Sequence, residues 1–202
     1  MSAIEVRPLS PRRIDDFLAF FDGAAFADNP WWSGCYCRFY HVMDADRVPD
    51  PATPQFAEYR ARNRDIQIAR IRAGAHGHLA YRDGRVVGWV NAAPSDAYEN
   101  PRAFAQAFRD APAATGMLMC FVVAPAERDK GVATALLNAA CEGFRADGLR
   151  HTQSFARRPE QPLAEWRSRE MADYHGPLSM YEANGFTKVA DLGHYAVMRK
   201  AL

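Results

Sequence analysis

The chain has 202 residues, of which 49% are hydrophobic and 24% charged, and its 25 basic and 24 acidic side chains give a formal net charge of +1. This length is enough to bury a substantial core without a disulfide or a metal, so we expect a single domain over residues 1–202. The balanced charge argues against a nucleic-acid partner, and no apolar run approaches the roughly 20 residues that cross a membrane.

The N-terminal third predicts a short strand and two helices around an irregular segment. The strand is expected over residues 4–8. A serine or threonine followed by proline opens each helix, over residues 10–21 and 53–73, because the hydroxyl can cap the first turn and proline fits its first position. The intervening residues 23–54 are rich in aromatic and turn-forming side chains and predict no regular element.

A β-hairpin is the clearest local prediction, with strands on either side of Asp83 and Gly84. This dipeptide tolerates the positive φ angles of a type I′ turn, so the hairpin should cover residues 79–93. A short helix is expected over residues 100–110. Residues 117–123 are almost continuously apolar, which is typical of a central strand covered on both faces.

The C-terminal third continues the alternation of helices and strands. Its first helix is expected over residues 130–148, where apolar side chains recur at three- and four-residue spacing. A strand over residues 152–156 follows, and then a polar insertion over residues 157–175. A short helix over residues 178–184 precedes the last two strands, over residues 187–192 and 195–200. The whole order argues for an α/β layer fold.

Residues 123–134 form the most informative segment, because a buried strand ends there in a loop that leads directly into a helix. The first turn of a helix has unpaired backbone N–H groups, and its dipole favours an anion. Gly131 and Ala133 keep side chains out of the way, while Arg128 and Lys130 add positive charge. The segment therefore predicts a phosphate or pyrophosphate cradle, with a turn that binds no ligand as the alternative. It matches neither a Walker A loop nor a dinucleotide fingerprint.

Two motifs resemble those of the GNAT acyltransferases. The acyl-CoA loop of that family reads R/Q-x-x-G-x-G/A between the fourth strand and a long helix, and residues 128–133 read R-D-K-G-V-A in this context. The second family marker, Y-x-x-x-G-F before the last two strands, is matched by Y-E-A-N-G-F at residues 181–186. The resemblance covers about residues 79–200.

The resemblance implies a GNAT acyl-CoA N-acyltransferase fold, an α/β fold with a mixed, mostly antiparallel sheet of six or seven strands and helices on both faces. Strands four and five would diverge to admit the pantetheine arm of acetyl-CoA. The implied cofactor-binding residues are Phe121, Val123, Arg128, Lys130, Gly131, Val132, Ala133 and Thr134. Two positions depart from the family pattern: Asp129 stands where a small residue is usual, and Tyr174, seven residues before Tyr181, where asparagine is frequent.

The activity that the resemblance implies is acetyl transfer from acetyl-CoA to a primary amine by direct attack in a ternary complex. The departing thiolate needs a proton, and Tyr181 is the expected catalytic donor because the family places the matching hydroxyl near the thioester sulfur; the alternative is that Tyr181 only packs. An alkylamine must also lose a proton, since its pKa is about 10.4. Candidate bases are Asp96, Glu99, His151, His175 and water, since the central strand has no carboxylate.

The acceptor is expected to be a small-molecule or peptide amine. In the GNAT scheme the connection between the first helices overhangs the acceptor pocket, and here residues 30–41 are dense in aromatic side chains. Trp31, Trp32 and Tyr36 are therefore expected to contact the acceptor. The alternative is that these side chains only pack an irregular segment.

The four cysteines are expected as reduced thiols of a cytoplasmic protein, since residues 1–7 lack a signal-peptide pattern. Cys35, Cys37 and His41 lack the usual C-x-x-C spacing and a fourth ligand, so no metal is expected. Cys120 is expected as an inert buried thiol rather than an acyl carrier. The sequence leaves open a non-catalytic acyl-CoA sensor, another acyl-CoA as donor, the acceptor's identity and a homodimer.

Overall fold

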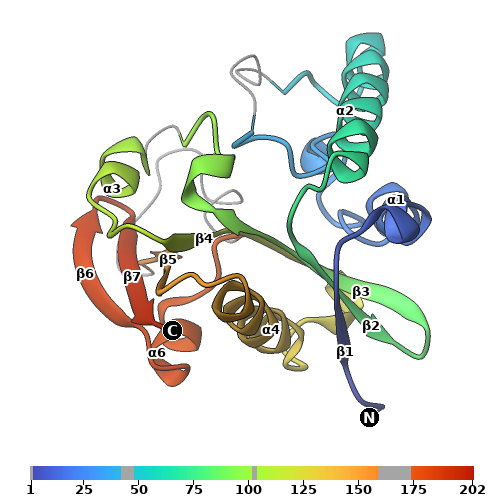
Figure 1. Ribbon diagram of the computed structural model, residues 1–202. Helices are drawn as coiled ribbons and strands as arrows, with labels where there is room; N and C mark the ends of the chain where they lie inside the picture. The colour runs from blue at the N-terminus through green and yellow to red at the C-terminus, as the bar shows by residue number, and fades with distance from the viewer. Residues whose placement is uncertain (1, 42–47, 102–103, 159–173) are drawn as a thin grey trace.

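A computed structural model describes residues 2–41, 48–101, 104–158 and 174–202 (Figure 1). Its centre is a seven-stranded sheet in the order β1-β2-β3-β4-β5-β7-β6. The strands are β1 Glu5–Pro8, β2 His78–Arg82, β3 Arg85–Pro94, β4 Thr115–Val123, β5 His151–Arg157, β6 Thr187–Leu192 and β7 Tyr195–Ala201. Among these described strands, β4 and β5 pair in parallel and the other neighbours are antiparallel. The predicted mixed, mostly antiparallel sheet is confirmed.

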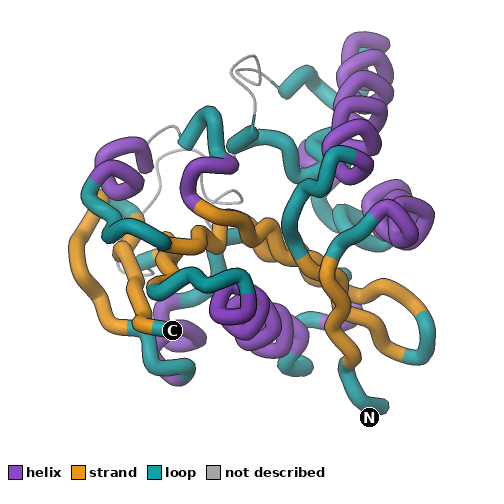
Figure 2. The backbone as a smooth tube through the Cα atoms, in the orientation of Figure 1, coloured by secondary structure: helices purple, strands orange, loops and turns teal. Residues whose placement is uncertain are grey.

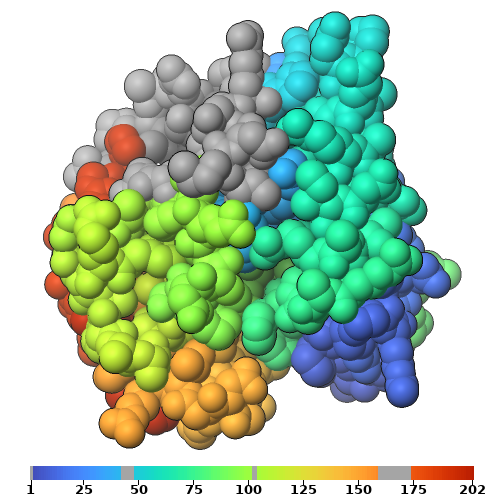
Figure 3. Space-filling view, turned by 45° about the horizontal axis from the view of Figure 1, so that its top comes forward, coloured from blue at the N-terminus to red at the C-terminus, as the bar shows by residue number. Residues whose placement is uncertain are grey.

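Helices cover both faces of this sheet (Figure 2). They are α1 Ile14–Asp22, α2 Pro54–Arg72, α3 Ala105–Arg109, α4 Val132–Ala146 and α6 Leu178–Ala183. Along β4, Leu118 belongs to the core beneath α4 and α6, whereas Met117 and Met119 belong to the core beneath α3. Successive side chains of a strand point to opposite faces, so β4 is covered on both sides, as predicted. Figure 3 shows α2 and α3 at opposite sides of one face of the molecule.

The predicted elements agree with the structure apart from their ends. Asp83 and Gly84 have φ angles of 50° and 74°, the two positive values that a type I′ turn requires. The helix expected over residues 100–110 is shorter, covering Ala105–Arg109. Residues 159–173 of the predicted insertion lie outside the described residues. None of the helices in the described ranges has the length and apolar character that crossing a bilayer requires.

β4 and β5 diverge halfway along their length. Their ladder ends at the pair Leu118 and Ser154, although β4 continues to Val123 and β5 to Arg157. Residues 174–177 lie between the diverging ends. The N–H of Phe121 on β4 donates to the carbonyl of Tyr174 at 2.6 Å, and the N–H of Arg157 on β5 donates to the carbonyl of Gly176 at 3.2 Å. The backbone of residues 174–177 therefore fills the space between the separated ends of β4 and β5.

Candidate active site

The loop between β4 and α4 depends on two left-handed residues. Asp129 and Gly131 have φ angles of 59° and 81°, and Val132 then begins α4. Aspartate is one of the few side chains that tolerate this region, so the departure from the family pattern at position 129 satisfies a backbone requirement. The first helical hydrogen bond is donated by Ala135 to the carbonyl of Gly131 at 3.0 Å. The amides of residues 132–134 therefore precede the helical ladder, as an anion cradle requires.

The two basic side chains of the loop are engaged by neighbours. Arg128 makes a bidentate contact with the carboxylate of Asp28, at 2.5 and 3.1 Å. Lys130 donates to the carbonyl of Ala126 at 2.6 Å, and its ammonium is 3.7 Å from Glu127. Arg128 thus ties the loop to the segment that follows α1, and an anion at this helix terminus would share the guanidinium with Asp28.

A pocket of about 410 Å³ lies beside this loop. Its lining residues are Asp28, Asn29, Phe121, Val123, Arg128, Ala133, Tyr174, Gly176 and Pro177. The structure thus brings together Phe121, Val123, Arg128 and Ala133 from the predicted cofactor set. The other four, Lys130, Gly131, Val132 and Thr134, lie on the loop and first turn beside the pocket, with the side chain of Val132 in the core. Sequence reasoning gave no signal for Asp28, Asn29 or Pro177.

A smaller pocket of about 40 Å³ lies on the α1 side of β4. Apolar side chains, thiols and one imidazole line it: Phe26, Trp32, Cys35, Cys37, Phe39, Tyr40, Met119, Cys120, Tyr174 and His175. Of the three residues predicted to contact the acceptor, Trp32 lines this pocket. Trp31 is half-buried and packs on the same core from outside the lining, and Tyr36 also lies outside it.

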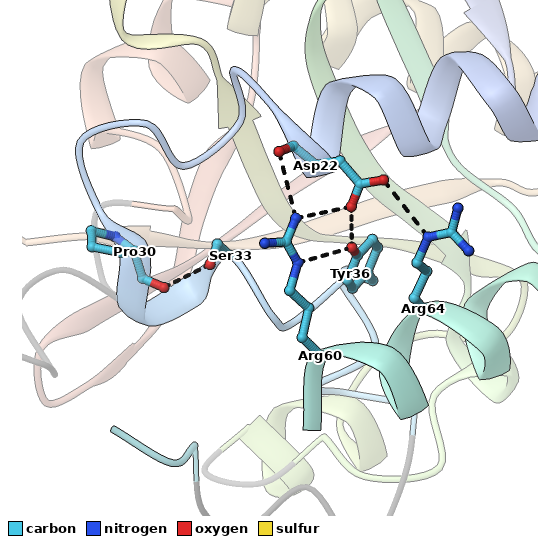
Figure 4. Close-up of polar contacts among 6 residues, drawn as sticks. All are labelled: Asp22, Pro30, Ser33, Tyr36, Arg60 and Arg64. Atoms are coloured by element: carbon cyan, nitrogen blue, oxygen red, sulfur yellow. Dashed lines mark hydrogen bonds and ion pairs between the residues drawn. The ribbon is translucent and has the colours of Figure 1, made fainter. Parts of the chain in front are cut away.

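Tyr36 belongs to a polar network that joins the end of α1 to α2 (Figure 4). The side chain is fully buried, and its hydroxyl donates to the Asp22 carboxylate at the end of α1. Asp22 also accepts from Arg60 at 3.0 Å and lies 3.7 Å from Arg64, both on α2. Burial raises the pKa of Tyr36, so the phenol keeps its proton. The network holds the aromatic segment against α1 and α2.

Tyr181 on α6 is fully buried at the point where β4 and β5 part. Its hydroxyl donates to the carbonyl of His175 at 2.6 Å and is 2.6 Å from the Oγ of Ser154. A Cβ atom built on Gly176, which lines the larger pocket, would be 3.5 Å from this hydroxyl. The hydroxyl therefore lies directly beneath the pocket wall. Burial raises the pKa of Tyr181, which keeps the phenol protonated at neutral pH.

The four candidate bases lie in different places. Asp96 and Glu99 are exposed after β3, and His151 begins β5 at the end opposite to the divergence. His175 is 1% exposed and lines the smaller pocket, with its Nε2 3.0 Å from the hydroxyl of Tyr40. Burial lowers the pKa of His175 to about 3, so the imidazole is neutral at pH 7 and accepts a proton poorly.

Three cysteines line the smaller pocket, and all are free thiols. The contact with the sulfur of Cys37 and burial raise the pKa of Cys120 well above its ordinary value. A thiol that stays protonated is a poor nucleophile, which disfavours Cys120 as an acyl carrier. Within the described ranges, no three His, Cys, Asp or Glu side chains are arranged to hold a metal ion.

Comparison with known proteins supports this architecture. Three solved structures share the fold: the PaiA N-acetyltransferase of Thermoplasma acidophilum in complex with coenzyme A (16% identity, TM-score 0.53, 99% of each chain), the GNAT domain of PAT from S. lividans (16%, 0.55, 98% of this chain and 90% of that one), and a GCN5-related N-acetyltransferase from Kribbella flavida (18%, 0.53, 99% and 98%). No curated protein sequence matches significantly. A sequence model described as the acetyltransferase (GNAT) family matches residues 38–166. Because this match spans more than half of the chain, the protein belongs to the acetyltransferase (GNAT) family, as its two motifs indicated.

Proposed function

We propose that the protein is an N-acetyltransferase that moves the acetyl group of acetyl-CoA directly to a primary amine of a small molecule or peptide. The observation that carries this proposal is the placement of two pockets on either side of Tyr174, where β4 and β5 diverge. The larger pocket adjoins the helix terminus suited to a pyrophosphate, and the smaller one is apolar. Coenzyme A in the T. acidophilum PaiA structure supports the choice of cofactor.

The cofactor is proposed to lie along the loop and β4. The amides of residues 132–134 hold the pyrophosphate, with Lys130 and Arg128 adding positive charge. The pantetheine arm follows β4, where Phe121 and Val123 offer backbone groups. This placement directs the thioester towards Tyr181, whose hydroxyl lies beneath Gly176.

The proposed reaction is a direct displacement at the thioester carbonyl. The neutral amine attacks the carbonyl carbon, a C–N bond forms, the C–S bond breaks, and the CoA sulfur takes the proton of Tyr181. The amine nitrogen then loses its extra proton to water, and water returns a proton to the Tyr181 phenolate. The raised pKa of Tyr181 means that the phenol is protonated at neutral pH before the thiolate forms. We assign the amine's own proton to water, since His175 with a pKa of about 3 is a weak base.

A panel of amines tests this function. Alkylamines, arylamines, amino acids and peptide N-termini would be incubated with acetyl-CoA while free CoA is followed with a thiol reagent. Release of CoA together with an acetylated amine is the expected result. Binding of acetyl-CoA without turnover on any amine would indicate a non-catalytic sensor. Faster turnover with a longer acyl-CoA would show that the natural donor is not acetyl-CoA.

The role of Trp32 can be separated from that of its neighbour. Trp32→Phe keeps an aromatic ring but reduces contact with the smaller pocket, so the acceptor KM should rise about three- to tenfold. Acetyl-CoA affinity, measured by calorimetry, should stay the same. Trp31→Phe is the matched control, and its acceptor KM should not change. A fall in acetyl-CoA affinity in Trp32→Phe would place this tryptophan on the cofactor side.

The charge of Asp129 can be removed without changing its backbone conformation. Asparagine tolerates a φ of 59° as aspartate does, so Asp129→Asn should fold normally. Removing a negative charge beside the pyrophosphate should tighten acetyl-CoA binding about two- to fivefold at low salt and less at high salt. Asp147→Asn, at the far end of α4, is the charge control and should have no effect. Equal affinities of Asp129→Asn and the wild type would show that Asp129 lies away from the phosphates.

A further inference from the structure

The backbone of residues 174–177 occupies the place where the proposed function requires the cofactor. The N–H of Phe121 donates to the carbonyl of Tyr174 in a short hydrogen bond of 2.6 Å. Phe121 is one of the two residues whose backbone groups are assigned above to the pantetheine arm, and this N–H is its only backbone donor. A backbone amide has one proton to donate. The Tyr174 carbonyl and an incoming pantetheine group therefore compete for it.

The side chain of Tyr174 separates the two pockets. It is among the lining residues of both the larger and the smaller pocket. Its hydroxyl accepts a hydrogen bond from the Nδ2 of Asn29 at 3.1 Å, and its ring packs edge-on against Phe26 with centroids 5.6 Å apart. Tyr174 is thus held by a backbone and a side-chain bond in the wall that an acetyl group must pass to reach the acceptor.

We propose that Tyr174 closes the passage between the two pockets and that the pantetheine arm of an acyl-CoA displaces it on binding. The arm takes the Phe121 N–H, the Tyr174 hydroxyl leaves Asn29, and the smaller pocket opens to the larger one. In this structure the smaller pocket has room for about three water molecules, and joining it to the larger pocket provides space for an acceptor. This inference rests on the proposed function.

The test is the affinity of Tyr174→Phe for coenzyme A, measured by calorimetry. Phenylalanine keeps the packing against Phe26 and removes the bond to Asn29. If that bond is broken on binding, its removal favours the open arrangement, and coenzyme A should bind about two- to tenfold more tightly. The 3′-phosphorylated ADP portion of coenzyme A keeps the pyrophosphate but lacks the pantetheine arm. Its affinity should be the same for wild type and variant.

Asn29→Ala removes the same hydrogen bond from the other partner. It should tighten coenzyme A binding to a similar extent, and the double variant should gain nothing further, because both changes remove one bond. If the wild type binds coenzyme A and Tyr174→Phe binds it no more tightly, the displacement of Tyr174 is wrong, while the proposed function still stands. If the variant also binds the fragment without pantetheine more tightly, and by the same factor, the displacement of Tyr174 by the pantetheine arm is wrong as well. A wild type that binds no coenzyme A would instead remove the proposed function.

Discussion

Replacing Gly131 with glutamate should reduce acetyl-CoA affinity by at least about a hundredfold. Gly131 is the residue before the first turn of α4, and no atom lies within 4 Å of a Cβ built there, so a glutamate side chain has room beside the helix terminus. Its carboxylate would be attracted by the unpaired amides and would take the place of a phosphate oxygen. Two unit charges 4 Å apart at a protein surface repel by about 4 kcal/mol, which is enough for an effect of this size.

The backbone strain of this substitution has a matched control just beyond the other end of the same helix. Gly148 has a φ of 79°, close to the 81° of Gly131, and no atom lies within 4 Å of its Cβ position either. Each glutamate should cost about 1–2 kcal/mol of stability, because a side chain is strained at positive φ. Gly148→Glu lies beyond the other end of α4 and should bind acetyl-CoA like the wild type. Unchanged calorimetric affinity in folded Gly131→Glu would place the pyrophosphate elsewhere.

The fold could be predicted because its signals are local. The spacing of apolar residues along α4 is visible within 15 residues, and six of them are buried against the sheet. The turn at Asp83 and Gly84 depends on the backbone preferences of two adjacent residues. The loop proposed to bind the cofactor is also continuous in sequence, so its helix terminus and Gly131 could be identified together.

The walls of the site could not be predicted, because they join residues far apart in the chain. Arg128 meets Asp28 across 100 positions, and Asn29 meets Tyr174 across 145. Aromatic density alone gave Trp31, Trp32 and Tyr36 equal weight. In the structure the hydroxyl of Tyr36 is turned towards Asp22, while Trp32 lines a pocket. Which ring of such a segment faces a cavity depends on tertiary packing, which periodicity does not encode.

Tyr181→Phe should lower kcat by 10²- to 10⁴-fold, the contribution that a positioned general acid typically makes. The ring stays, but the carbonyl of His175 loses its donor and Ser154 loses a hydrogen-bond neighbour. Unfolding free energy should therefore fall by about 1–3 kcal/mol. Tyr81→Phe is the matched control, since its buried ring also carries a bonded hydroxyl, to Asp16 at 2.7 Å. It should lose stability but keep kcat.

The control decides between catalysis and packing because both variants lose a hydrogen-bonded hydroxyl from a buried ring. If Tyr181 is the acid, its variant alone loses kcat, while coenzyme A affinity stays near that of the wild type. Burial raises the pKa of Tyr181 above that of an ordinary phenol, so the wild type should show no loss of rate from its ionisation between pH 6 and 9. Solvent-viscosity measurements establish whether the chemical step limits kcat. With chemistry limiting, a loss below threefold would mean that Tyr181 only packs and that water protonates the departing thiolate.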